Sequence, residues 1–212
     1  EAKIDPLPGA AESAFLARLK ESPWDAGWDF KGMSQFGRSV SDVDMLLIAL
    51  GKCRFGAAAD EVVRKAASLT AADAYSHFRA IALAAEGCAT TDEARHRLAE
   101  ALHRLLSLPG IGGYARERPE PIPGFDDAAA DRERTLVLRE LVLARALLAL
   151  GDRDSLGRRT LSAYVRDGRK AYAHHARLVL ERFGGRATDT AALQAAIDAA
   201  AKAGGGVVRV PA

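Results

Sequence analysis

Proline is scarce in this 212-residue chain, and its distribution is the first guide to the fold. The eight prolines leave two long intervals, residues 24–108 and 124–210, without any proline. Because proline lacks a backbone N–H and clashes with the preceding turn, it is rarely tolerated inside a helix. We therefore expect long helices within these two intervals.

Long apolar runs and an excess of one charge are also lacking. The 30 basic and 28 acidic residues leave a formal net charge of +2, and 49% of the residues are hydrophobic. This balance is typical of a folded globular chain. No apolar run approaches the ~20 residues that a membrane-spanning helix needs.

Residues 1–10 lack the basic start and apolar centre of a signal peptide. The localisation is therefore unknown: the chain is cytosolic, or it is exported with its signal already removed, or it is a piece of something longer.

Cysteine is limited to Cys53 and Cys88, and neither has a second ligand at metal-binding spacing. We expect both to be small buried apolar side chains. A single disulfide is the alternative, and it would need an oxidising compartment. The signatures G-x-S-x-G, H-E-x-x-H, C-x-x-C and the P-loop are absent as well. We therefore assign no catalytic, cofactor-binding or metal-ligand residue, and we expect no cofactor in this chain.

The chain is instead rich in segments with helical periodicity. Ser41 and Thr91 are predicted N-caps, because Ser and Thr side chains accept hydrogen bonds from the free N–H groups of a first helical turn. Apolar residues recur at three- and four-residue spacing, as on the buried face of a helix. The expected helices cover residues 10–22, 42–51, 57–68, 70–86 and 92–107, with three more between 131 and 183.

Three stretches share one plan, in which an apolar helix ends at a glycine and a short polar turn leads to a more charged helix. The glycines are Gly51, Gly87 and Gly151, and a long loop over residues 107–130 precedes the third copy. Helix pairs of this kind stack because no single pair can bury its apolar face alone. The predicted fold is therefore all-α, an α-α superhelix of stacked helix pairs of HEAT-like or TPR-like type.

The helical-repeat domain is assigned to residues 1–183. Its segment 131–149 is apolar almost all round, so we expect that helix to be buried on more than one side. Residues 184–212 are expected to form a linker, a helix and a lone β-strand over residues 207–210. This tail would be the start of a truncated following domain.

Histidine side chains provide two candidate sites. His96, Glu100 and His103 share one helix face, at a spacing that a metal ion could use. Arginines flank them, so a solvated outer face is the favoured interpretation. His174 and His175 are adjacent on a helix and could act as a general acid and base, but without a supporting carboxylate they are better explained as surface histidines.

Aromatic and basic residues offer two ligand-binding surfaces. Trp24 and Trp28 could stack on sugar rings, although indoles in such a loop more often pin it to the core. The positive charge after residue 153 could bind an acidic partner, either nucleic acid or a uronate-rich polysaccharide, or it could be the solvated face of two helices. Only Tyr164 and Tyr172 are interleaved with these charges, so nucleic acid is the less expected partner. The residues of this basic face are Arg158, Arg159, Arg166, Arg169, Lys170, His174 and Arg177.

Residues 110–115 (GIGGYA) match the dinucleotide fingerprint G-x-G-x-x-G/A. That fingerprint works only between a strand and a helix, whose N-terminus holds the pyrophosphate. Here a helix and Pro109 precede it, and a proline-rich stretch follows. We therefore reject a cofactor site and expect the glycines to serve the bends of the long loop.

Residues 138–180 (LRELVLARALLALGDRDSLGRRTLSAYVRDGRKAYAHHARLVL) resemble the helical C-terminal region of large bacterial FAD-dependent oxidoreductases, some of which carry a xanthan-lyase-like label. Ser76–Glu86 and Leu106–Ala115 are similar to parts of the same region. In that family the flavin-binding domain lies upstream. The resemblance thus implies FAD in a missing upstream domain, and it assigns no flavin-binding residue to this chain.

Residues 189–212 (DTAALQAAIDAAAKAGGGVVRVPA) resemble the opening of pectate-lyase-like right-handed β-helix domains. In those domains a helix of this kind caps the first coil, and a V-x-V-P strand begins it. The resemblance implies a carbohydrate-related context. It includes no lyase catalytic residue.

Three functions from different classes follow as hypotheses. The favoured one is a non-catalytic accessory or scaffold domain of a larger FAD-dependent oxidoreductase or polysaccharide-active protein, with the other domains of that parent chain as partners. The second is a free-standing adaptor that binds a protein or an acidic polysaccharide through the basic face. The third is a helical lyase or nucleic-acid-processing enzyme that uses His174 or His175.

Overall fold

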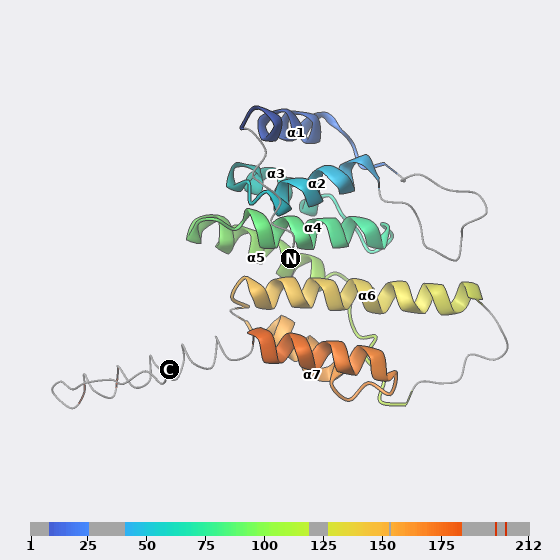
Figure 1. Cartoon of the computed structure of the whole chain (residues 1–212). Coiled ribbons are helices and arrows are strands. Elements are labelled where there is room, and N and C mark those ends of the chain that lie inside the picture. Colours follow the sequence, from blue (N-terminus) through green and yellow to red (C-terminus); the bar gives the residue numbers. More distant parts are fainter. Residues whose placement is uncertain are drawn as a thin grey trace.

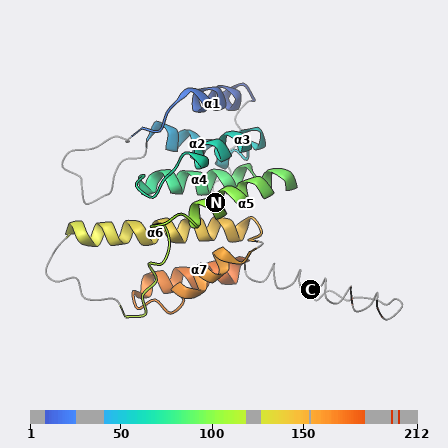
Figure 2. The ribbon, with the colours of Figure 1, turned by 180° about the vertical axis from the view of Figure 1, so that it is seen from behind.

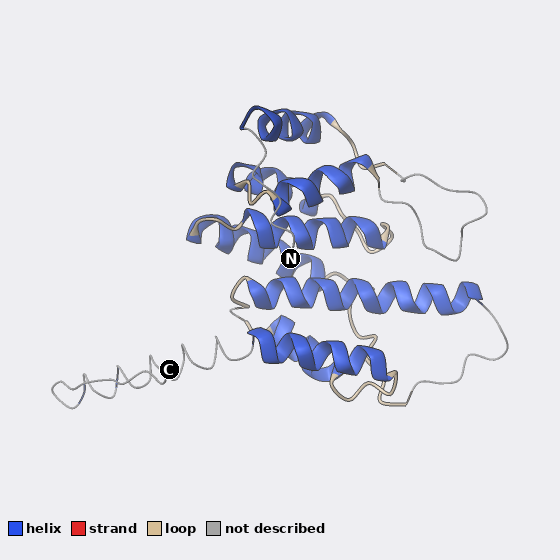
Figure 3. Cartoon of the chain, viewed as in Figure 1, coloured by secondary structure: helices blue, strands red, loops and turns tan. Residues whose placement is uncertain are grey.

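The helices form a stack that runs from α1 at one end to α7 at the other (Figure 1). The structure is a computed structural model. It describes residues 9–25, 41–118, 127–152, 154–183, 198 and 202, and only the backbone of residues 127–131. All regular secondary structure in these ranges is helical, without a strand (Figure 3), so the all-α prediction is confirmed. The strand predicted over residues 207–210 lies outside the described ranges.

Most helices agree with the predicted segments, but the helix expected over residues 70–86 begins only at Tyr75. A short 3₁₀ turn, Gly56–Ala58, precedes the third of them, and a final helical segment covers residues 170–183. The others are α1 Gly9–Glu21, α2 Asp42–Lys52, α3 Ala59–Ala67, α4 Tyr75–Cys88, α5 Asp92–Leu106, α6 Asp127–Ala149 and α7 Leu156–Tyr164.

Two rows of helices build the stack. In one row α2 packs on α4, and α4 packs on α6; behind it, α3 packs on α5 (Figures 1 and 2). Helix α7 packs on α6, and α1 covers α2 and α3 at the other end. The described helices therefore form a stack, whereas their arrangement as helix pairs in a superhelix of HEAT-like or TPR-like type stays a prediction.

Local capping rules explain where several helices begin. The Ser41 hydroxyl accepts from the Asp44 N–H at 3.1 Å, and the Asp44 carboxylate accepts from the Ser41 N–H at 3.2 Å. This reciprocal pair is a capping box. The Thr91 hydroxyl likewise accepts from the Ala94 N–H at 3.1 Å. Both predicted N-caps are confirmed.

Two of the three predicted helix-ending glycines have another role. Gly51 and Gly87 lie inside the last turns of α2 and α4, which end one residue later. A Cβ atom added to Gly87 would lie 1.8 Å from the Gly51 carbonyl oxygen. The absence of side chains thus lets two helix backbones touch, and the prediction that these glycines end their helices is wrong. Gly151 does follow the end of α6, with a positive φ of 113°.

Helix α6 lies in the centre of the core. Its apolar residues face α4, α5 and α7, and those between 137 and 150 are mostly buried, as the composition of this segment predicts. The helix begins at Asp127, so the connection predicted over residues 107–130 ends earlier than expected. No described helix combines the length and apolar character needed to span a membrane.

Both cysteines are free thiols. Cys88 is fully buried and Cys53 is half-buried, which agrees with the apolar packing role predicted for them. Burial, together with the nearby Cys53 thiol, raises the pKa of Cys88 to about 12. The Cys88 thiol is therefore held in its neutral form.

Candidate functional site

A segment over residues 107–118, here called the strap, joins the end of α5 to the region around α7. It crosses α6 on the face shown in Figure 2 and carries the buried side chain of Ile111. Gly110 and Gly113 adopt positive φ values of 81° and 92°. Glycine adopts this conformation without strain. The expected use of the GIGGYA glycines as bends is confirmed.

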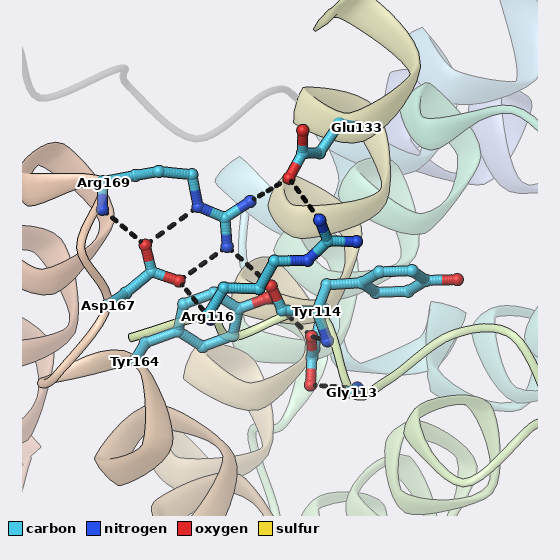
Figure 4. Close-up of polar contacts among 8 residues, drawn as sticks. Gly113, Tyr114, Arg116, Glu133, Tyr164, Asp167 and Arg169 are labelled. Carbon is cyan, nitrogen blue, oxygen red and sulfur yellow. Dashed lines mark hydrogen bonds and ion pairs between the residues drawn. The ribbon is translucent and has the colours of Figure 1, made fainter. Parts of the chain in front are cut away.

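The strap is bound to α6 through Glu140, which is almost fully buried. Its carboxylate accepts hydrogen bonds from the backbone N–H groups of Gly113 at 2.9 Å and Tyr114 at 3.0 Å. The Tyr164 hydroxyl donates to the same carboxylate at 2.6 Å (Figure 4). The backbone groups that a phosphate would need in the dinucleotide motif are thus occupied by Glu140.

Asp167 and Arg169 bind the other end of the strap. Asp167 accepts from the Arg116 N–H at 2.9 Å and from the Arg169 N–H at 2.8 Å (Figure 4). The Arg169 guanidinium donates to Asp167, to Glu133 of α6 at 2.7 Å and to the Tyr114 carbonyl at 2.6 Å. Arg169 therefore belongs to an internal network, although the sequence placed it on the basic face.

The pKa shifts in this network agree with a structural role. Burial, followed by the hydrogen bond and charge of Glu140, raises the pKa of Tyr164 far above its ordinary value. Burial opposes ionisation of Asp167, yet hydrogen bonds from Arg169 and Arg116 together lower its pKa below 3.8. Tyr164 thus stays a hydrogen-bond donor and Asp167 a charged acceptor at neutral pH.

A groove lies between α5 and the turn that joins α6 to α7. Its volume is about 790 Å³. Ala99, Leu147 and Leu150 form its apolar part. The polar lining residues are Asp92, Arg95, His96, Glu100, His103, Arg104, Ser107, Asp152 and Asp154.

The predicted group His96, Glu100 and His103 lies along this groove, but its members form two separate pairs. His96 Nε2 lies 3.0 Å from Glu100 Oε1, and His103 Nε2 lies 3.5 Å from Asp154 Oδ2. In the part of the chain that the structure describes, no three His, Cys, Asp or Glu side chains meet in a way that could hold a metal ion. The first pair lies within α5, whereas the second joins α5 to the α6–α7 turn.

The basic face is only partly available to a ligand. Arg166 pairs with Glu117 of the strap at 3.1 Å, and the Arg159 guanidinium donates to the Asp154 carbonyl at 2.6 Å. Arg158 is half-buried at the start of α7, where its backbone N–H donates to the Asp152 carboxylate at 2.7 Å. Exposed residues of the helix over residues 170–183 complete the face; they are Lys170, His174 and Arg177.

His174 and His175 are both exposed, and neither is hydrogen-bonded to a described carboxylate. Partial burial, then the charges of Arg145 and His174, lowers the pKa of His175. Among the residues that the structure describes, no carboxylate orients either histidine as a general base.

Trp24 is bound to the core. Its indole N–H donates to the Ser68 hydroxyl at 2.9 Å, and its ring lies 4.4 Å from the ring of His77. This placement agrees with the alternative that Trp24 pins its loop to the core. The ring face toward His77 is therefore unavailable to a sugar. Trp28 lies outside the described residues.

Sequence reasoning did not identify the buried polar residues that matter most. Glu140, Tyr164 and Asp167 form the strap network, and Asp44 pairs with His77 at 2.8 Å in a second buried contact. One signal was present: Arg139 and Glu140 lie within the mostly apolar part of α6, residues 136–149. Charged residues are rarely buried there unless they are paired.

Comparison with protein-family models, with curated proteins and with solved structures gave no match for this chain. The function is therefore argued from the geometry described above.

Proposed function

We propose that this chain is a non-catalytic helical scaffold domain, an accessory part of a larger FAD-dependent oxidoreductase or polysaccharide-active protein. One observation carries the non-catalytic role: the buried polar side chains are committed to holding segments of the domain together. Glu140 and Tyr164 join the strap, α6 and α7. Asp44 and His77 join α2 and α4.

The geometry of these groups supports a structural use. A general base or nucleophile needs an approach path for its substrate, whereas Tyr164 and Asp44 are fully enclosed. The groove is open, but its histidines are paired with carboxylates on its own walls. Contacts of this kind stabilise the fold of a domain whose role is to bind other molecules at its surface.

The proposal that this domain belongs to a larger parent protein rests on the sequence resemblance. The mass and the visible absorbance of the natural polypeptide test it. An antibody raised against this domain should isolate a polypeptide with a mass above the 22.5 kDa of this chain. That polypeptide should show the visible absorbance of bound flavin. The isolated 212-residue chain should show no such absorbance. A natural polypeptide of about 22.5 kDa without flavin would contradict the parent-protein proposal.

An adaptor for acidic polysaccharide is the second candidate, and one observation favours it. Lys170, His174 and Arg177 are exposed on one helix, and none forms an ion pair with another described residue. Polygalacturonate should therefore bind, and Lys170→Gln with Arg177→Gln should weaken binding by about tenfold at low salt. The matched control is Arg18→Gln with Lys20→Gln on α1, which removes the same charge elsewhere. Equal weakening by both double variants would remove the adaptor function.

A further inference from the structure

The groove arises from a break in the second row of helices. Helix α5 packs on α3, and α7 packs on α6, but α5 and α7 have no comparable contact with each other. The end of α6 is therefore left between them as the floor of an open groove. At about 790 Å³, its size falls within the roughly 300–1,000 Å³ that is usual for ligand sites.

The rim of the groove is electronegative. It carries the carboxylates of Asp92, Glu100 and Asp154, each more than half exposed. The lining follows α5 from its start at Asp92 to Ser107 beyond its end, so the two ends of the α5 dipole offset each other. Helix α6 contributes only its C-terminal end, at Leu150, which carries partial negative charge.

The positive groups in the lining do not cancel this field. The Arg104 guanidinium is bound to the Ala66 carbonyl of α3 at 2.7 Å, so it is held toward α3. Arg95 makes only a long contact with Asp92, at 3.9 Å. Asp152 accepts from the N–H groups of Gly157 and Arg158 and is already satisfied. His96 and His103 lie against Glu100 and Asp154, and they carry positive charge only when protonated. With these histidines neutral, the lining holds four carboxylates against two arginines, so its net charge is negative.

The apolar residues of the lining also limit which ligand side chains fit the groove. Leu147 and Leu150 are nearly covered, and Ala99 is small, so no deep pocket exists for a large aromatic or aliphatic anchor. Lysine and arginine lay their aliphatic stems along such shallow apolar surfaces while their charged ends reach polar groups. A segment rich in lysine or arginine matches both the floor and the rim.

We propose that this groove binds a basic peptide segment of a partner protein. Its lysine or arginine side chains pair with Glu100 and Asp154 on opposite walls, and their stems lie on Ala99, Leu147 and Leu150. The surface is distinct from the basic face, and its charge preference is the opposite. It extends the proposed scaffold role by giving the chemical class of one partner.

Fluorescence anisotropy tests the assignment with a labelled Lys–Ala peptide of about 12 residues, which is roughly three helical turns. The groove variant is Glu100→Gln with Asp154→Asn. We expect it to bind about tenfold more weakly than the wild type. The matched control is Glu21→Gln with Glu93→Gln, which removes two exposed carboxylates outside the groove lining and should bind within about twofold of the wild type.

Two further measurements make the test specific. A Glu–Ala peptide of equal length should not bind, and amide chemical-shift changes caused by the Lys–Ala peptide should fall on α5 and the α6–α7 turn. Absence of Lys–Ala binding, or equal weakening in the two double variants, would overturn the proposal. Sedimentation that shows self-association lost only in the groove variant would overturn it in favour of a second copy as the occupant.

The parent-protein proposal and the groove proposal can be contradicted independently of each other. A small natural polypeptide without flavin would remove the parent-protein proposal and leave the groove assignment intact. Unchanged peptide binding by the groove variant would remove the groove assignment alone. Because all four substituted carboxylates are exposed, each variant should keep the circular dichroism spectrum of the wild type.

Discussion

Charged residues in the interior have the largest individual effects on this molecule. Arg139 is buried, and its guanidinium donates to the carbonyls of Ala71 at 2.7 Å and Gly110 at 2.8 Å. Asp167 and Arg169 pair with side-chain exposures of 0% and 17%. Removing one partner of such a pair leaves a buried charge without compensation, which costs far more than loss of a surface pair.

Asp167→Asn is expected to lower the free energy of unfolding by about 3 kcal/mol at pH 7, because Arg169 and the Arg116 N–H lose a charged acceptor. The folded-state pKa of Asp167 is lowered, so its contribution is present above pH 3.8 and is lost as the pH falls through the folded pKa. Urea unfolding at pH 7 and pH 3 should therefore show a smaller difference between variant and wild type at pH 3.

Glu117→Gln is the matched control for Asp167→Asn, since Glu117 lies in the strap that Asp167 binds but pairs with Arg166 on the surface. Its loss should change stability by less than about 1 kcal/mol. An equal loss in both variants, or one that does not vary with pH, would contradict the role given to Asp167.

At the scale of elements, the crossing of α2 and α4 depends on two missing side chains. A Cβ added to Gly51 would lie 2.7 Å from the Leu83 carbonyl oxygen, and one added to Gly87 would meet the Gly51 backbone. Backbone atoms cannot move aside as the end of a flexible side chain can, so the helices must separate. The interval between these glycines did suggest a repeat, but the reason for their presence is contact and not termination.

Gly87→Ala should lower the free energy of unfolding by roughly 3 kcal/mol, because overpacking forces α2 away from α4. Gly9→Ala is the control, since Gly9 is the first residue of α1 and its added Cβ would meet nothing within 4 Å. Thermal unfolding should show a clear drop in Tm for the first variant and no drop for the second. A Gly87→Ala protein as stable as the wild type would show that the helices are not in the contact described.

At the scale of the whole molecule, one hydrophobic core runs through the stack. Its buried residues extend from Leu19 on α1, through Phe78 and Leu143, to Val179 on the last described helix. The strap adds a polar connection between α5, α6 and α7. A continuous core of this kind couples the unfolding of its helices.

We therefore expect a single cooperative unfolding transition in urea. Far-UV circular dichroism reports the whole stack, and Trp24 fluorescence in a Trp28→Phe variant reports the α1 end, where the indole contacts Ser68 and His77. The two midpoints should coincide. An earlier Trp24 transition would show that the α1 end unfolds independently of α6 and α7.

The sequence by itself determined the helical class, most helix boundaries and both N-caps. These follow from interactions within a few residues, such as the Ser41–Asp44 box and the period of apolar side chains. It also predicted that the GIGGYA glycines serve bends, because their neighbours could not form a dinucleotide fold. Local chemistry was sufficient in each case.

Only the tertiary structure decided which polar residues are internal and which surfaces are open. Glu140 meets Gly113 from 27 residues away, and Asp167 meets Arg116 from 51 residues away. The sequence placed Arg169 with the exposed cations because its partners come from the strap and α6. The groove likewise exists because α5 and α7 do not pack together, and the spacing of residues within either helix carries no information about that distance.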